Sequence, residues 1–329
     1  MDIAYAGGIV RTLFADKRAG LAVAGQEVPL FPPMVNGGFY SLPSYLSTQG
    51  VAGVKWTSHV KPVGDAWDVG PYTKPVVVLS SLADGRPIAL VDGFEISAIR
   101  TAAVSYDFFR RMVKEDGTCG PRNRVLCCGA GHQATWQVIA ALRAFPSLDR
   151  LYVWSRDPAH AQACIQTVRG LLGPGNNALV AKLCVAESVD SATPDVDVVI
   201  GATSAEKPYL RREHVSNATY VHIGMNDIEA DAIRSFDRIV CDDFRAGTAT
   251  SAQSLFVLYR QDNSIASRVT LLEDQPEHLA AGRLMFDSFG LSIFDVGLAF
   301  EVYRSALERG LGEKLDLYAT PAASEERHV

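Results

Sequence analysis

The sequence predicts an α/β protein whose larger part is a doubly wound parallel sheet. Two observations carry this prediction. Beyond Pro121, short apolar runs alternate with segments of helical periodicity, which is the pattern of parallel strands covered on both faces by helices. In addition, the first of these strand–helix junctions has closely spaced glycines, as expected where the chain turns sharply and leaves its backbone accessible.

Composition narrows the class of protein. The chain has 329 residues, of which 48% are hydrophobic and 21% charged, and its formal net charge is −6. This length predicts two domains. An acidic chain without a long apolar run favours neither nucleic-acid binding nor a membrane span. Six cysteines without a C-x-x-C pair suit buried thiols rather than a metal site. The start lacks a secretory signal pattern, so we expect a cytoplasmic protein with no nucleic-acid or membrane partner.

The elements are expected in the following order. Residues 9–24 read as a helix, followed by strands at 53–56, 75–80 and 88–91 and a helix at 95–113. The turn residues at 83–87 predict a hairpin, and the Gly- and Pro-containing segment 115–121 predicts a domain boundary. Further strands are expected at 124–128, 151–154, 181–186, 196–202, 220–223 and 238–241, and further helices at 133–145, 158–172, 228–235 and 292–308.

The glycine motif predicts a phosphate-binding loop. The strand 124–128 runs into Gly129-Ala130-Gly131-His132-Gln133-Ala134, a G-x-G-x-x-A pattern at the start of a helix. Gly129 permits the sharp turn, Gly131 leaves room for a pyrophosphate, and the alanine allows close packing of helix on strand. The free N–H groups of the helix would face the phosphates. A Rossmann-type dinucleotide site is therefore predicted, the alternative being a tight turn without a ligand.

Two further strand ends supply candidate cofactor contacts. Ser155 and Arg156 follow the second strand, and a hydroxyl beside a guanidinium suits the 2′-phosphate of NADP. Asp157, one position further, would suit the ribose of NAD, so the cofactor is NADP or NAD, with NADP favoured. Thr203 lies at the carboxyl end of another strand, where ligands of open sheets bind.

Several segments, taken in order, resemble the ornithine cyclodeaminase/μ-crystallin family. The resemblance lies in Gly53-Val54-Lys55-Trp56, Ile96–Ala103 with its Arg-Thr-Ala-Ala run, Gly129–Ala134, Val198–Ser204, His222-Ile223-Gly224, and Ser288-Phe289-Gly290 followed by Asp295. It extends over about residues 28–311.

The resemblance implies a fold and an activity. It implies a Rossmann-type domain over 119–289 and a second α+β domain for substrate binding and dimerisation over 1–118, completed by residues 290–318, with a frayed tail at 319–329. The implied activity is NAD(P)-dependent interconversion of an α-amino acid and its imine or 2-keto acid, in a homodimer. The alternatives are a cyclodeaminase of ornithine or lysine type with tightly bound NAD, and a non-catalytic nucleotide-binding protein.

Site residues follow from the same resemblance. Lys55 and Arg100 would hold the substrate carboxylate, which suits an ammonium and a forked guanidinium; surface ion pairs are the alternative. Thr101 would contact a cofactor phosphate, His132 and Gln133 would lie along the pyrophosphate, and Ser288 would lie near the nicotinamide.

The resemblance also implies an acid/base carboxylate after the segment 222–224, and two neighbouring residues could fill that position. Asn226 occupies the aligned position and Asp227 the next one. An amide cannot shuttle a proton, so Asp227 is favoured; its alternative role is to cap the helix 228–235.

The sequence also departs from the family pattern. The segment 29–38 has no basic residue, although many members have an arginine there as a further carboxylate anchor. Trp56 and the segment 287–291 favour the opine-type or imine-reductase branch over the cyclodeaminases.

Overall fold

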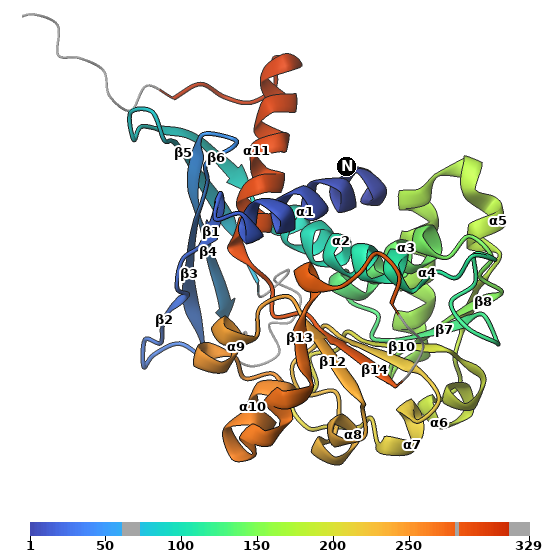
Figure 1. The fold of residues 1–329 in the computed structure, drawn as a ribbon. Helices are drawn as coiled ribbons and strands as arrows, with labels where there is room; N and C mark the ends of the chain where they lie inside the picture. The colour runs from blue at the N-terminus through green and yellow to red at the C-terminus, as the bar shows by residue number, and fades with distance from the viewer. Residues whose placement is uncertain (61–72, 280–282, 316–329) are drawn as a thin grey trace, which may run out of the picture.

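The computed structural model describes residues 1–60, 73–279 and 283–315, and these residues form two sheets with helices packed between and around them (Figure 1). The first sheet is antiparallel, with strand order β1-β3-β4-β5-β6 and β2 paired with β3. Its strands are β1 (Ala22–Ala24), β2 (Val28–Leu30), β3 (Gly37–Leu46), β4 (Val51–Val60), β5 (Val76–Ser81) and β6 (Pro87–Asp92). The turn between β5 and β6 is the predicted hairpin.

The second sheet is parallel, as predicted. Its order is β13-β12-β14-β11-β10-β7-β8-β9, so the winding direction reverses between β7 and β10. Ligands of such sheets bind beyond the carboxyl ends of the strands at this reversal. The strands are β7 (Arg124–Cys128), β8 (Arg150–Trp154), β9 (Leu183–Val185), β10 (Val198–Gly201), β11 (Thr219–His222), β12 (Arg238–Cys241), β13 (Val269–Leu271) and β14 (Leu284–Asp287).

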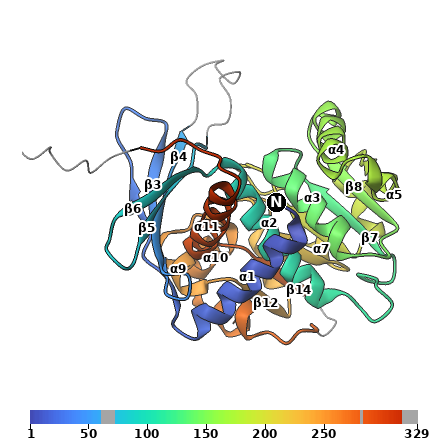
Figure 2. The ribbon, with the colours of Figure 1, turned by 90° about the horizontal axis from the view of Figure 1, so that it is seen from above.

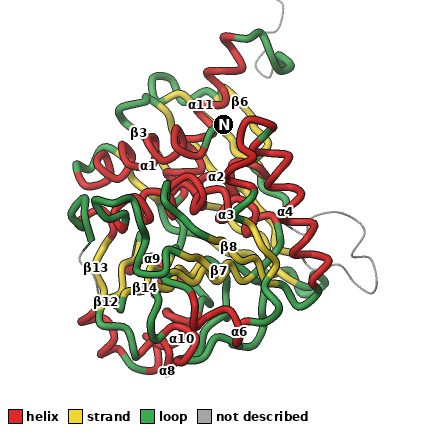
Figure 3. The backbone as a smooth tube through the Cα atoms, turned by 90° about the vertical axis from the view of Figure 1, so that its right-hand side faces the viewer, coloured by secondary structure: helices red, strands yellow, loops and turns green. Residues whose placement is uncertain are grey.

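Helices cover both faces of the parallel sheet. In Figure 3, α2 and α3 lie above the strands, and α6, α8 and α10 lie below them. The helices are α1 (Ile3–Arg18), α2 (Phe94–Met112), α3 (His132–Ala144), α4 (Pro158–Leu172), α5 (Asn177–Val180), α6 (Val189–Ala192), α7 (Arg212–Val215), α8 (Ala230–Arg234), α9 (Phe244–Thr250), α10 (Ser254–Gln261) and α11 (Ser292–Glu308). Short 3₁₀ turns occupy 174–176, 193–195, 263–268 and 272–274.

Helices α1, α2 and α11 fill the space between the two sheets (Figure 2). One hydrophobic core runs through them from Leu46 and Val77 of the antiparallel sheet to Val125 of the parallel sheet. On the way, the rings of Phe108 and Phe286 stack with centroids 4.5 Å apart. The antiparallel sheet lies within residues 22–92 and the parallel sheet within 124–287; the domain limits given above remain predictions.

The first helix differs from its predicted position. It runs from Ile3 to Arg18, and residues 22–24 form β1 instead of its end. The carboxylate of Asp2 accepts from the N–H groups of Ala4 and Tyr5 and so caps the helix start, whereas Gly20, with φ of +74°, ends it. The prediction rested on apolar periodicity, which does not register the capping aspartate at the start of the helix or the glycine at its end. Strands β2, β3, β13 and β14 and helices α9 and α10 were not predicted, and the predicted tail lies outside the described residues.

Within the described part of the chain, no helix combines the length and apolar character needed to cross a bilayer. Five of the six cysteines are buried thiols, as the sequence predicted, and Cys184 is half-buried.

Candidate active site at the carboxyl edge of the parallel sheet

The glycine loop lies at the reversal point of the parallel sheet. Gly129 follows β7 with φ of +125°, a conformation that side chains rarely adopt. A Cβ added at Gly129 would lie 2.3 Å from the carbonyl oxygen of Ala202, which follows β10. The two strands that flank the reversal therefore meet at a position where only glycine fits.

The start of α3 offers room for a phosphate group. Gly131 is the N-cap residue of α3, and a Cβ added there would meet nothing within 4 Å. The first N–H groups of a helix have no partner within it and carry partial positive charge. Open space in front of such a helix end is the shape that a pyrophosphate requires, so the loop fits a dinucleotide.

The side chains next to the loop face α2. The ring of His132 stacks on Phe94 at 4.4 Å, and Gln133 donates to the carbonyl of Ser97 at 3.4 Å. The hydroxyl of Thr101 donates to the same carbonyl at 2.8 Å. These three predicted cofactor residues thus meet at the α2–α3 contact, and their interaction with phosphate remains a prediction.

The segment after β8 presents the predicted ribose contacts. The strand ends at Trp154, so Ser155 and Arg156 follow directly; Ser155 is half-buried and Arg156 exposed. The carboxylate of Asp157 accepts from the N–H of Ala159 and caps α4. The residue that would favour NAD is therefore engaged in a helix cap in this structure.

Lys55 and Arg100 meet on a carboxylate from a third element. Lys55 projects from β4, Arg100 from α2, and Asp295 lies in the first turn of α11. The Nζ of Lys55 lies 3.0 Å from Oδ2 of Asp295, and the Nε of Arg100 lies 3.2 Å from Oδ1. All three residues are buried. We refer to these three residues as the cation clamp.

The cation clamp retains donors for a ligand. Asp295 engages one hydrogen of the Lys55 ammonium and the Nε of Arg100; the two terminal nitrogens of Arg100 make no hydrogen bond to the described residues. Those nitrogens form the fork that grips a carboxylate. Burial lowers the pKa of Lys55, and the charge of Asp295 counteracts this shift.

The turn after β14 adjoins the clamp. At Gly290, with φ of +93°, an added Cβ would lie 2.4 Å from a terminal nitrogen of Arg100. The carboxylate of Asp242 accepts from the Ser288 hydroxyl at 3.2 Å and from the N–H groups of Phe289 and Gly290 at 2.8 and 2.9 Å. Burial raises the pKa of Asp242 to about 6 despite these donors. Asp242 therefore fixes the turn that carries Ser288.

Asp227 lies beneath Thr203. Its carboxylate accepts a short hydrogen bond from the Thr203 hydroxyl, and it is fully buried, whereas Asn226 is half-buried. Burial raises the pKa of Asp227. Glu229, not Asp227, is the N-cap residue of α8, so the alternative capping role is wrong. Within the described residues, Asp227 makes no hydrogen bond or ion pair with Lys55 or Arg100.

A buried histidine lies near this carboxylate. Nδ1 of His222, at the end of β11, lies 2.7 Å from the carboxylate of Asp287 at the end of β14, and both side chains are fully buried. Burial opposes a charge on His222, but the charge and hydrogen bond of Asp287 outweigh it and raise the pKa of His222.

Sequence reasoning missed several of these roles. Asp242 and Asp287 each lie at the carboxyl end of an apolar strand, a position that can mark a ligand-facing edge. Asp295, flanked by Phe294 and Val296 in an apolar helix, is the kind of buried charge that needs a partner. In both cases the signal was present, but it did not identify the partner.

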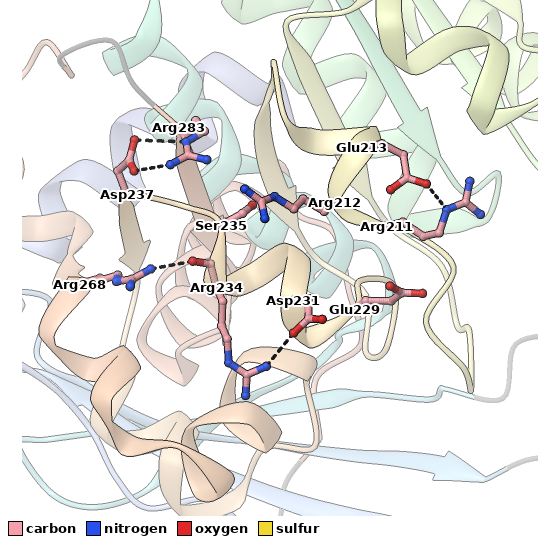
Figure 4. A pocket seen from close by; sticks show the side chains of 10 residues that line it. All are labelled: Arg211, Arg212, Glu213, Glu229, Asp231, Arg234, Ser235, Asp237, Arg268 and Arg283. Carbon is pink, nitrogen blue, oxygen red and sulfur yellow. Dashed lines mark hydrogen bonds and ion pairs between the residues drawn. The ribbon is translucent and has the colours of Figure 1, made fainter.

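A separate surface cavity lies away from this site. It has a volume of about 740 Å³ and is lined by charged side chains, including the ion pair of Arg283 and Asp237 (Figure 4). Asp237, Arg268 and Arg283 directly precede β12, β13 and β14, so the cavity lies at the amino edge of the parallel sheet. Ligands of this sheet type bind at the opposite edge, and the cavity is separate from the candidate site.

Comparison with known proteins finds relatives in sequence and in fold. A Δ1-pyrroline-2-carboxylate reductase of Bacillus cereus is 22% identical over 262 residues, covering 73% of this chain and 74% of the relative. The structure of the Thermococcus litoralis enzyme of that name, in complex with NADH and L-proline, superposes with a TM-score of 0.82 at 20% identity over 96% of each chain. An archaeal alanine dehydrogenase dimer with bound NAD gives a TM-score of 0.81 at 20% identity, covering 97% of this chain and 96% of that one.

The family profile covers nearly the whole chain. The description that matches, over residues 2–310, is the ornithine cyclodeaminase/mu-crystallin family. The match includes the glycine loop, all three residues of the cation clamp and Asp227. The chain therefore belongs to the ornithine cyclodeaminase/mu-crystallin family.

Proposed function

We propose that this protein is an NAD(P)-dependent oxidoreductase that interconverts an α-amino acid and its imine or 2-keto acid. The observation that carries the proposal is the cation clamp, in which two cations converge beside the carboxyl edge of a parallel sheet with a dinucleotide-type glycine loop. The relatives named above act on imino or amino acids according to their names.

The substrate carboxylate binds Lys55 and Arg100. The terminal nitrogens of Arg100 form two parallel hydrogen bonds, and Lys55 adds a point charge. The carboxylate of Asp295 accepts a hydrogen bond from each of the two cations and so holds them in place. Fixing the carboxylate fixes the α-carbon, and orientation of this kind contributes several kcal/mol to lowering a barrier, on the order of 7–11 in favourable cases.

The residues around the glycine loop hold the cofactor. Gly129, Gly131 and the first N–H groups of α3 bind the pyrophosphate, with Thr101, His132 and Gln133 beside it. Thr203 and Ser288 lie toward the nicotinamide end. When bound, the nicotinamide supplies the hydride acceptor or donor.

Asp227 manages the amine proton through Thr203. The Thr203 hydroxyl donates to Asp227, so it can pass a proton to the carboxylate while it accepts one from the substrate amine. Burial, which raises the pKa of Asp227, brings this carboxylate closer to the range useful for acid/base work. Asn226, which is half-buried at the neighbouring position, is the alternative contact, as a hydrogen-bonding group only.

NADP is the preferred cofactor. Ser155 and Arg156 face no competing carboxylate from Asp157, which caps α4. We expect Arg156→Ala to raise the KM for NADPH about tenfold and to leave the KM for NADH within a factor of two or so, because only the former carries the 2′-phosphate. Equal effects on both cofactors would contradict the preference.

The protein forms a homodimer through the outer face of the antiparallel sheet. Among the described residues, the helices lie against the other face of this sheet (Figure 1). The strand register places six exposed apolar side chains on the outer face: Val23, Val28, Leu30, Tyr45, Trp56 and Leu90. Exposed apolar side chains gathered on one uncovered sheet face favour an interface. Trp56→Lys combined with Leu90→Lys should halve the mass measured by light scattering; an unchanged mass would exclude this face.

The proposed activity is tested by the cofactor balance. We expect NAD(P)H oxidation at 340 nm with an imine, or with a 2-keto acid and an amine, and loss of turnover in Lys55→Ala, Arg100→Ala and Asp227→Asn, with less loss in Asn226→Ala. Full turnover in the first two variants would overturn the site. Ammonia release without net change in cofactor would instead identify a cyclodeaminase.

A further inference from the structure

The last residues of three neighbouring strands form a row at the carboxyl edge of the parallel sheet. Asp287 of β14 pairs with His222 of β11, which pairs in turn with Gly201 of β10. Side chains of paired residues on adjacent strands project to the same face of a sheet. On that face, His222 is therefore flanked by a carboxylate on one side and by a glycine on the other.

The space over Gly201 is occupied by the proposed acid/base carboxylate. A Cβ added at Gly201 would lie 3.0 Å from Oδ2 of Asp227 and closer still to the hydroxyl oxygen of Tyr220. Tyr220 precedes His222 by two positions in β11, and their rings stack with centroids 5.7 Å apart. The row thus places His222 between the carboxylate of Asp287 and that of Asp227.

The charges of His222 and Asp227 act on each other. Burial raises the pKa of Asp227, and the charge of His222 lowers it. Burial lowers the pKa of His222, whereas the charges of Asp287 and, to a smaller extent, Asp227 raise it. An imidazolium and a carboxylate placed in this way each favour the charged form of the other.

Weak acids border Asp227 on its other sides. They are the thiol of Cys128, at the end of β7, and the phenols of Tyr209 and Tyr220. Burial is the main cause that raises the pKa of each of these groups, so all three are neutral near pH 7. Of these neighbours of Asp227, His222 alone can carry a positive charge.

Stability alone does not account for the pair of His222 and Asp287. Both side chains are fully buried, and Nε2 of His222 has no hydrogen-bond partner among the residues that the structure describes. Apolar side chains of similar volume are often at least as stable as a buried ion pair. Buried charge pairs of this kind gather at functional sites, where they set the charge of a neighbouring group.

We propose that His222 is a positioning residue for the amine proton: its imidazolium, held by Asp287, is the countercharge that keeps the buried carboxylate of Asp227 ionised. The proton of the substrate amine moves to the hydroxyl oxygen of Thr203, whose own proton moves to Asp227, and the imidazolium keeps its proton throughout. This inference rests on the proposed function, because it takes Asp227 as the group that receives the proton.

Histidine NMR of the full-length protein tests the electrostatic contact without any substrate. The His222 ring gives the signal that is absent from His222→Asn and displaced in Asp287→Asn. We expect Asp227→Asn to lower the pKa of this ring by about one pH unit or more, as the loss of a nearby opposite charge does. An unchanged titration of His222 in Asp227→Asn would overturn this inference and leave the proposed activity intact.

The pH profile of kcat/KM for amino-acid oxidation tests the consequence for the reaction. Asp227 must be ionised to take the proton, so its pKa sets the acidic limb of the profile. Asp287→Asn removes the group that holds the imidazolium, and we expect this limb to move to higher pH by about one unit, with turnover recovering at high pH. His222→Asn should move the limb in the same direction. Turnover lowered by one factor at every pH would indicate a merely structural pair and overturn the proposal.

His214→Asn is the matched control. His214 is also a buried histidine paired with an aspartate, since its Nε2 lies 2.9 Å from Asp190, but it belongs to α7, whose neighbouring residues line the cavity at the amino edge. Its replacement should leave the acidic limb at the wild-type pH, and an equal shift there would overturn the specific role of His222. Absence of turnover with every amino acid and imine, despite the NMR shift, would overturn the proposed function and this inference with it.

Discussion

The glycine loop and the cation clamp both border the carboxyl edge of the parallel sheet, but they are assembled from very different stretches of chain. The loop consists of six consecutive residues, Gly129 to Ala134. The clamp joins Lys55, Arg100 and Asp295, and the lysine and the aspartate are 240 positions apart in the sequence. The loop depends on local backbone conformation, whereas the clamp depends on charge balance among three elements that only the tertiary fold brings together.

The difference predicts different consequences of mutation. A change in the loop should act on cofactor binding through space and backbone angle. A change in the clamp should act first on stability, because buried charges that lose their partner carry a large desolvation cost.

The largest effect is expected at Asp295. Asp295→Ala leaves Lys55 and Arg100 buried without their shared carboxylate, and removal of one partner from a buried charge group costs about 3–5 kcal/mol. Urea unfolding followed by circular dichroism measures this loss. As a control, Asp84→Ala breaks the exposed pair of Asp84 and Arg86 and should leave the midpoint unchanged, since exposed pairs contribute little. Similar midpoints for Asp295→Ala and wild type would show that the clamp is not a stability element.

The next effect separates the two glycines of the loop. Gly129→Ala forces a side chain into a left-handed conformation and against the Ala202 carbonyl, so we expect a loss of about 1–3 kcal/mol of stability as well as weaker cofactor binding. Gly131→Ala meets open space, with φ of −82°, and should leave the melting temperature unchanged while it weakens cofactor binding.

Fluorescence titration with NADPH and thermal melting together distinguish these outcomes. If Gly131→Ala binds the cofactor as tightly as the wild-type protein, the space in front of α3 is not the pyrophosphate site. If Gly129→Ala is as stable as wild type, the loop rearranges more readily than its backbone angles indicate.

The smallest effect is a pH dependence at Asp242. Unlike Asp295, this buried aspartate makes no ion pair with any residue that the structure describes. Burial raises the pKa of Asp242 to about 6, above its value in the unfolded chain. As the pH falls, the Asp242 carboxylate is therefore protonated at a higher pH in the folded state than in the unfolded chain. The stabilisation of the folded state by this protonation is complete below about pH 4, and it is lost as the pH rises through 6. Between pH 7 and pH 5, the free energy of unfolding should gain about 1 kcal/mol from this group.

Asp242→Asn isolates that contribution. The variant keeps an acceptor for the turn at 288–290 but no longer titrates, so the difference in stability between wild type and variant should change over this pH interval. Denaturant unfolding at pH 5, 6 and 7 measures it. A difference that is constant with pH would show that Asp242 does not titrate there.

The sequence predicted local features better than features that depend on the tertiary fold. Strands such as 124–128 and helices such as 158–172 were predicted at their observed ends, because apolar periodicity and end residues act within a few positions. The helix at 9–24 was misplaced where Asp2 and Gly20 set the ends instead. Strand β3 was missed because its half-exposed alternation includes Gly38 and Pro43, residues that usually mark loops.

The sequence by itself determined the parallel-sheet class, the glycine loop and the family, since these depend on local patterns and their order. It also indicated Lys55 and Arg100 as carboxylate ligands. Only the tertiary structure decided that Asp295 joins them, that Asp242 fixes the Ser288 turn, that Asp227 lies beneath Thr203, and that His222 lies beside Asp227. The physical reason is that electrostatic partners are selected by distance in space and by burial, and neither is a function of separation along the chain.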